Sequence, residues 1–170
     1  MDTFRQHPNL VKYNKAIQED GKSPLFPTKG SSEGGNFNLL YYAFLLGVSS
    51  GERETREIAQ NQECWPEANK RWPAAFSQYK YVIINLLLVG YATELNTVIE
   101  GKTFPKLLHK IVDPNDPNDL SEIGYARFNQ YSYKGFELLE NIHPWPTNGI
   151  GTFIKINDKL QENFSKSPWV

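Results

Sequence analysis

Apolar residues recur at helical spacing in several separate stretches of this chain. Residues 9–20 place Leu10 and Ile17 on one face, which predicts a short helix. Residues 37–48 are almost continuously apolar, and their length favours a buried helix over a strand, with Asn36 as its N-cap.

Four further helices are predicted, over residues 74–93, 103–112, 120–142 and 152–164. The first is too long for an ordinary strand, and the last has a strand over 151–156 as its alternative. Either Asp119 or Ser121 would cap the third helix, and Gly135 would weaken its middle by about 1 kcal/mol relative to alanine. We expect the 37–48 and 74–93 helices to lie at the centre of the fold.

The connections are rich in residues that break regular structure. Residues 23–36 hold several glycines and prolines and predict a loop, residues 113–119 predict an acidic turn-forming loop, and residues 149–151 predict a glycine turn. The pattern as a whole predicts a mostly α fold, a compact bundle-like globule of five to seven helices with long Gly/Pro-rich connections. We expect one helical domain over 1–164 and a mobile C-terminal end over 165–170.

The composition of the chain narrows the range of functions and partners that we expect for it. Among 170 residues, 18 basic and 19 acidic side chains leave a net charge of −1, which disfavours nucleic-acid binding spread over the whole surface. The polar start of the chain lacks the apolar core of a signal peptide, and no apolar run is long enough to span a bilayer, so we expect a cytoplasmic protein without a membrane partner. Aromatic residues make up 14% and favour a subunit of a larger assembly, with an aromatic-rich core as the alternative.

Histidine and cysteine, which often act in catalysis or bind metals, are present but do not have the spacing of known catalytic or metal-binding motifs. His7, His109 and His143 do not have the separation of metal ligands, and Cys64 has no histidine near it in sequence. The Gly30–Gly35 spacing matches a phosphate-binding loop, but Asn36 stands where the loop's lysine belongs. Backbone N–H groups of these glycines could still take an anion. We predict no catalytic motif, no metal site and no cofactor.

Basic and aromatic residues form the candidate partner-binding set. Lys102, Lys106 and Lys110 recur every four residues and so line one helical face. A second concentration interleaves cations with tryptophans, a mixture that suits a nucleic-acid backbone or an acidic protein; a solubilising surface is the alternative for both groups. Its members, with one further tryptophan in a proline-rich segment, are Arg53, Arg56, Trp65, Lys70, Arg71, Trp72 and Trp145.

Three segments carry a family resemblance. They are a Pro-Leu-Phe-Pro loop at 24–27 leading to the apolar stretch 42–47, a second apolar helix at 83–95, and the Tyr-Lys-Gly-Phe-Glu-Leu-Leu run at 133–139. In this order the chain resembles small bacterial accessory proteins encoded beside DNA-phosphorothioation modification and restriction clusters and related phage-defence loci. The resemblance covers about half of the chain, and residues 65–72 and 145–170 are additional to it. It implies a non-catalytic component of a defence complex and transfers no catalytic residue.

Three functional hypotheses follow. The first is a non-catalytic accessory subunit of a bacterial DNA-modification or antiviral defence complex, which binds a larger protein subunit, with DNA as a further candidate partner. The second is a hydrolase or nuclease whose site assembles only in space, from His109 or His143 with aspartate or glutamate. The third is a small DNA-binding regulator whose affinity falls with salt.

Overall fold

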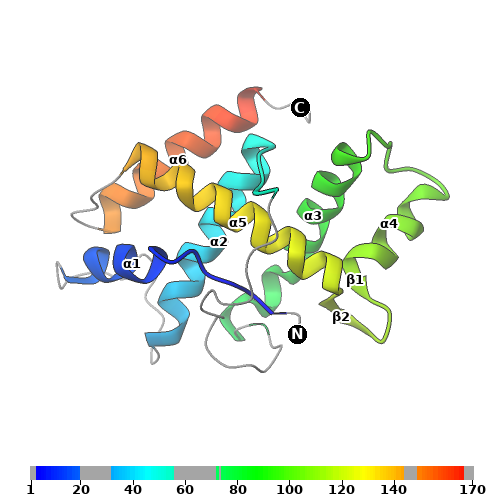
Figure 1. Ribbon diagram of the computed structural model, residues 1–170, viewed down its shortest axis with the longest axis horizontal. Coiled ribbons are helices and arrows are strands. Elements are labelled where there is room, and N and C mark those ends of the chain that lie inside the picture. Colours follow the sequence, from blue (N-terminus) through cyan, green and yellow to red (C-terminus); the bar gives the residue numbers. More distant parts are fainter. Residues whose placement is uncertain (1–2, 20–31, 56–71, 73, 144–148, 167–170) are drawn as a thin grey trace.

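The structure is a computed structural model that describes residues 3–19, 32–55, 72, 74–143 and 149–166 (Figure 1). Over these ranges the chain is mostly helical, as predicted, with one short two-stranded antiparallel sheet. The elements, in chain order, are α1 (Leu10–Glu19), α2 (Ser32–Ser50), a 3-10 helix η1 (Ala74–Tyr79), α3 (Lys80–Glu94), α4 (Thr103–Ile111), β1 (Val112–Asp113), β2 (Asp116–Leu120), α5 (Glu122–Ile142) and α6 (Gly149–Lys166).

The centre of the fold is the crossing of α2 and α5, which share the most extensive contact in the molecule. Phe44 on α2 stacks on Phe128 on α5, with ring centroids 4.6 Å apart and both side chains fully buried. The two helices come close because glycines face the other backbone. A β-carbon at Gly135 would overlap the Ala43 carbonyl oxygen, and one at Gly47 would overlap the Tyr131 carbonyl oxygen.

This pairing corrects two expectations. The expected central pair was 37–48 with 74–93, but α3 touches α2 only slightly and packs against α4 and α5 instead. Gly135 was expected only to weaken its helix, whereas its missing side chain is what admits α2. The spacing of hydrophobic residues predicts that a helix has an apolar face, but it does not show which other helix packs against that face.

The remaining elements are arranged at the two ends of α5. Figure 1 shows α1 and α6 beside the half of α5 that ends at Ile142, and α3, α4 and the strands beside the half that begins at Glu122. The N-cap of α5 is Ser121, whose hydroxyl accepts from the Gly124 N–H at 3.0 Å, so Ser121 and not Asp119 fills the predicted role.

Several element boundaries differ from the predicted ones. Helix α2 begins at Ser32, so Asn36 is not its N-cap. The predicted 74–93 helix is divided into the 3-10 helix η1 and α3. Helix α6 begins at Gly149 and is helical throughout, so the glycine turn over 149–151 and the alternative strand over 151–156 are both wrong. It runs on to Lys166, and residues 167–170 of the expected C-terminal end lie outside the described residues.

The acidic segment after α4 is a hairpin and not the predicted loop, although Asp, Asn and Pro are poor strand formers. Aspartate side chains accept hydrogen bonds from the backbone two residues on, from Asn115 N to Asp113 Oδ1 at 2.8 Å and from Asn118 N to Asp116 Oδ1 at 2.9 Å. The turn at Asp113 folds the chain back between the two short strands, whose antiparallel pairing contains a register shift between Val112 and Asp113. Within the described residues, no helix combines the length and the apolar character that crossing a membrane requires.

Candidate functional site

The most distinctive surface lies on the part of the molecule formed by α3, α4 and the hairpin, which we call the arm (Figure 1). Helix α4 is strongly two-sided. Leu107 and Ile111 are buried against the rest of the arm, whereas Lys106 and Lys110 are exposed. Lys102, at the N-cap position of α4, is exposed as well. Lys106 and Lys110 therefore lie exposed on α4, and Lys102 directly precedes the helix.

We call Lys102, Lys106 and Lys110 the lysine row. Neighbouring members are four residues apart, which corresponds to about 6 Å along a helix axis. Among the described residues, none of the three takes part in an ion pair, although ion pairs occur elsewhere on α5 and α6. The row therefore presents ammonium groups whose charge no neighbouring carboxylate neutralises by direct contact.

Apolar side chains lie exposed close to the row in sequence. The exposed fractions are 69% for Val98, 50% for Leu95 and 42% for Phe104. The loop that carries Val98 is held in one conformation by Thr103, whose hydroxyl lies 2.6 Å from the carbonyl oxygens of both Val98 and Glu100. Because the same hydroxyl accepts from the Glu100 N–H at 3.0 Å, the loop and the first turn of α4 form one connected unit.

Carboxylates stand at both ends of the lysine row. Glu100 precedes it, and four more follow in the hairpin and the start of α5, namely Asp113, Asp116, Asp119 and Glu122. The stretch 95–122 thus carries three lysines and five carboxylates. In sequence the lysine row is therefore flanked by acidic residues, and the stretch as a whole has no positive excess.

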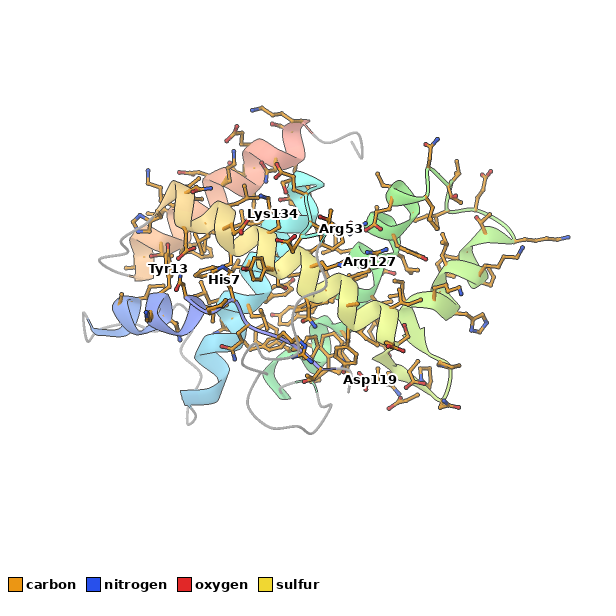
Figure 2. The ribbon with its side chains drawn as sticks, viewed as in Figure 1. His7, Tyr13, Arg53, Asp119, Arg127 and Lys134 are labelled. Carbon is orange, nitrogen blue, oxygen red and sulfur yellow. The ribbon has the colours of Figure 1, made fainter. Side chains whose placement is uncertain are left out.

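The base of the arm is anchored by Glu94, the last residue of α3. Its carboxylate receives Arg53 Nε at 2.8 Å, an Arg127 terminal nitrogen at 3.1 Å and the Tyr131 hydroxyl at 3.1 Å. Arg127 also lies over the Tyr91 ring, 5.5 Å from its centroid. Figure 2 shows Arg53 and Arg127 facing the same region beside α5. Burial and the adjacent carboxylate both raise the pKa of Tyr131, so this hydroxyl remains a donor to Glu94.

This cluster changes the interpretation of one predicted residue. Arg53 belonged to the candidate partner-binding set, and it is half-buried in an internal ion pair. Its partner Glu94, and Arg127 on the same carboxylate, were not predicted, because they lie 41 and 74 positions away in sequence and form no pattern with it. Glu94 and Arg127 come together because α3 packs on α5.

Other predicted residues have varied placements. Trp72 is half-buried and packs edge-on against Phe4, with centroids 5.0 Å apart. Several members of the predicted set, and the Gly30 end of the proposed anion-binding loop, lie outside the described residues, so they stay predictions: Arg56, Trp65, Lys70, Arg71 and Trp145.

The three histidines lie in different surroundings. His7 is buried between aromatic rings, His109 is exposed on α4, and His143 ends α5. Burial, with a smaller contribution from Lys155, lowers the pKa of His143. Over the described ranges, neither His109 nor His143 hydrogen-bonds a carboxylate, and no group of three or more His, Cys, Asp or Glu side chains is placed to hold a metal ion.

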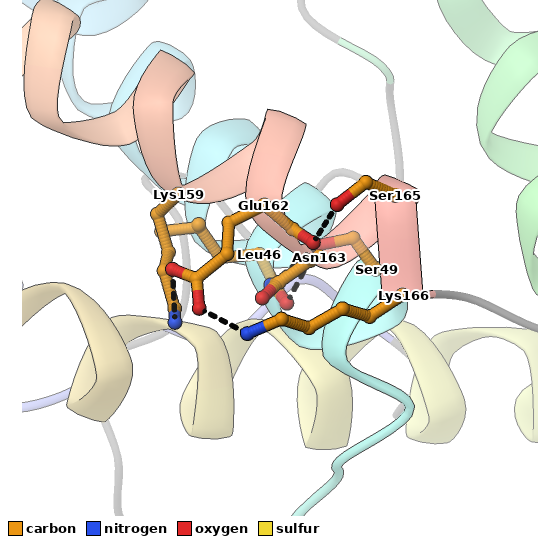
Figure 3. A network of polar contacts seen from close by, with 7 residues as sticks. All are labelled: Leu46, Ser49, Lys159, Glu162, Asn163, Ser165 and Lys166. Carbon is orange, nitrogen blue, oxygen red and sulfur yellow. Dashed lines mark hydrogen bonds and ion pairs between the residues drawn. The ribbon is translucent and has the colours of Figure 1, made fainter.

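A cleft of about 380 Å³ lies where the end of α2 meets α6. In Figure 3, Glu162 lies between two lysines of its own helix, at 2.9 Å from Lys159 and 2.6 Å from Lys166. These lysines hold the pKa of Glu162 at about 2. With Glu52 also in the lining, the cleft carries as many carboxylates as ammonium groups, so it selects neither anions nor cations by charge.

Comparisons of the chain with protein families, with curated proteins and with solved structures returned no match.

Proposed function

We propose that this protein is a binding subunit and that the lysine row on α4 is its contact with a larger protein partner. The unneutralised, exposed row carries this proposal. The wider setting we propose is that of an accessory subunit in a cytoplasmic bacterial DNA-modification or antiviral defence complex, which rests on the resemblance of the segments 24–27, 42–47, 83–95 and 133–139.

The chemistry of the partner follows from the row and its borders. Lysines that recur every four residues, about 6 Å of helix rise, match carboxylates with the same spacing on a partner helix. The acidic residues at both ends of the row would repel a continuous polyanion and would tolerate a short acidic segment flanked by basic residues. Charge complementarity of this mixed kind favours an acidic protein face over a nucleic-acid backbone.

Apolar contact would supply the affinity that surface charges lack. Exposed charge pairs contribute little to affinity and mainly set association rate and register. Val98, in the loop that the Thr103 hydroxyl contacts, and Phe104, in the first turn of α4, are both exposed and lie near the row in sequence. Because little ordering is needed on binding, these side chains can act as anchors at a modest entropic cost.

The proposal is tested by mixing the full chain with each purified protein encoded beside its gene and following complex formation by size-exclusion chromatography and calorimetry. We expect a complex with one of these proteins whose affinity falls as salt is raised. A duplex DNA probe is titrated in parallel. If the chain binds DNA with a salt slope near −3, the value of about −0.9 per contacted phosphate for three lysines, the regulator hypothesis replaces this one. A monomer that binds none of these proteins contradicts the proposal.

A further inference from the structure

Residues 3–7 lie along α5 in the manner of a bound extended peptide. The amide of Asn129, in the middle of α5, contacts the main chain of this segment twice. Its Oδ1 accepts from the Arg5 N–H at 2.8 Å, and its Nδ2 donates to the Thr3 carbonyl at 2.9 Å. Asn129 is only 5% exposed, and this pair of bonds recognises peptide backbone whatever the side chain.

Phe4 is the anchor of the segment. It is 3% exposed and meets four aromatic rings edge-on, with centroid distances between 4.8 and 5.1 Å. The rings come from α2, from α5 and from a residue two positions before η1, and they are Phe37, Trp72, Tyr125 and Phe128. Edge-to-face contacts of this kind select an aromatic side chain by shape and by the quadrupole of the ring.

A second position lies three residues further on. The ring of His7 packs 4.5 Å from Tyr133 and 4.7 Å from Phe136, measured between ring centroids. The rings that meet Phe4, the amide that meets the backbone and the rings that meet His7 succeed one another along α5, so the segment runs in the same direction as that helix. In Figure 1 this thin blue segment follows α5 before it enters α1.

One polar atom shows that the chain's own segment does not satisfy this surface fully. Within the described part of the chain, Trp72 Nε1 is buried without a hydrogen-bond partner, as is Gln6 Oε1 of the segment itself. Trp72 is itself one of the four rings around Phe4. A buried donor without an acceptor lowers the stability of the arrangement that contains it, so a peptide with a suitable acceptor would be bound more favourably than the present occupant.

We propose that this face of α5 is a binding site for an extended peptide, occupied intramolecularly by residues 3–7. The ligand class is a segment of a partner protein with an aromatic anchor and a second flat ring three residues later, of which Phe4 and His7 are the example on the chain itself. The exposed Pro8 and Asn9 join the segment to α1, and release of the segment would break the hydrogen bond from the Asn9 N–H to His7 Nδ1, whereas the bond from the Asn9 amide to Glu140 on α5 does not involve the segment. This site is separate from the lysine row, so either proposal can fail without the other.

The test uses a synthetic peptide with the sequence of residues 3–9 and a fluorophore at its C-terminus, titrated into the full chain and followed by anisotropy. The Phe4→Ala chain should bind this probe at least tenfold more tightly than the unaltered chain, because the competing intramolecular anchor is lost. Adding Asn129→Leu to that variant should remove most of the binding, and a probe with alanine in place of its phenylalanine should not bind. A Phe4→Ala chain that keeps its thermal transition and shows no saturable binding overturns the proposal, as does equal binding of both probes.

Hydrogen exchange of the unaltered chain gives a second test that needs no folded variant. The Arg5 amide, which donates to Asn129, should exchange at least tenfold faster than the amides of Phe44 and Phe128 in the α2–α5 core. If Arg5 exchanges only with these core amides and shows the same denaturant dependence, the segment opens only on global unfolding and the proposal is wrong.

Discussion

Gly135 on α5 lies against the Ala43 carbonyl on α2 so closely that a β-carbon at position 135 would overlap that oxygen. The helix crossing at the centre of the fold therefore depends on an absent side chain. Gly47, one turn along α2, meets the main chain of Tyr131 in the same way, so each helix contributes one glycine to the contact.

Replacing Gly135 by alanine should destabilise the protein, although alanine favours a helix by about 1 kcal/mol. The added methyl group must push two backbones apart, which costs about 3 kcal/mol when a packed core is overfilled. Urea denaturation followed by circular dichroism measures the difference. Gly101→Ala is the matched control, because Gly101 has positive φ and nothing within 4 Å of its β-position, so its loss should be only about 1 kcal/mol. A smaller effect at Gly135 than at Gly101 would contradict the close crossing.

Replacing Glu94 by glutamine should loosen the base of the arm. The change keeps the shape of the side chain and removes the charge shared by Arg53 and Arg127, which are each about three-quarters buried. Because the loss leaves two guanidinium groups without their carboxylate, we expect the free energy of unfolding, measured by urea denaturation, to fall by about 2 kcal/mol. A double-mutant cycle with Arg53→Gln should give a coupling of about 1 kcal/mol. Additive effects would show that the two residues do not interact.

Lowering the pH should destabilise the protein through His7. Burial lowers the pKa of His7 below 6.5, more strongly than Glu140 and Glu137 raise it. The neutral ring also accepts the Asn9 N–H at Nδ1, 3.2 Å away. The unfolded chain then binds a proton more readily than the folded chain, so the stabilising contribution is complete above pH 6.5 and is lost as the pH falls below it.

The measurement is the melting temperature between pH 7.5 and 5. His7→Gln should flatten the fall below pH 6.5, leaving the smaller contribution of His143, whose pKa is lowered as well. His109→Gln, at an exposed position on α4, serves as the control and should leave the profile unchanged. If both variants show the same profile as the unaltered protein, burial of a neutral His7 does not contribute to the acid response.

The sequence was most informative where local spacing decides structure. The spacing of Phe104, Leu107, Leu108 and Ile111 predicted the helix α4, and Leu107 and Ile111 are buried as expected, although Phe104 is exposed. It was least informative where contact depends on chain topology. The meeting of Glu94 with Arg53 joins positions 41 apart, and the hairpin at 112–120 is made of residues that individually disfavour strands. The hydrogen bonds of Asn129 with Thr3 and Arg5 could not be predicted either, because they join residues 126 and 124 positions apart in sequence.

Contact of the lysine row with an acidic protein face is tested by measuring how two charge reversals change the Kd for the partner protein. Lys106→Glu reverses the middle of the row, and Lys12→Glu makes the same charge change at an exposed position on α1. We predict that Lys106→Glu raises the Kd at least tenfold and that Lys12→Glu changes it less than twofold, at about 0.15 M salt where long-range effects are screened. Equal effects of the two reversals, or none from Lys106→Glu, would contradict the account.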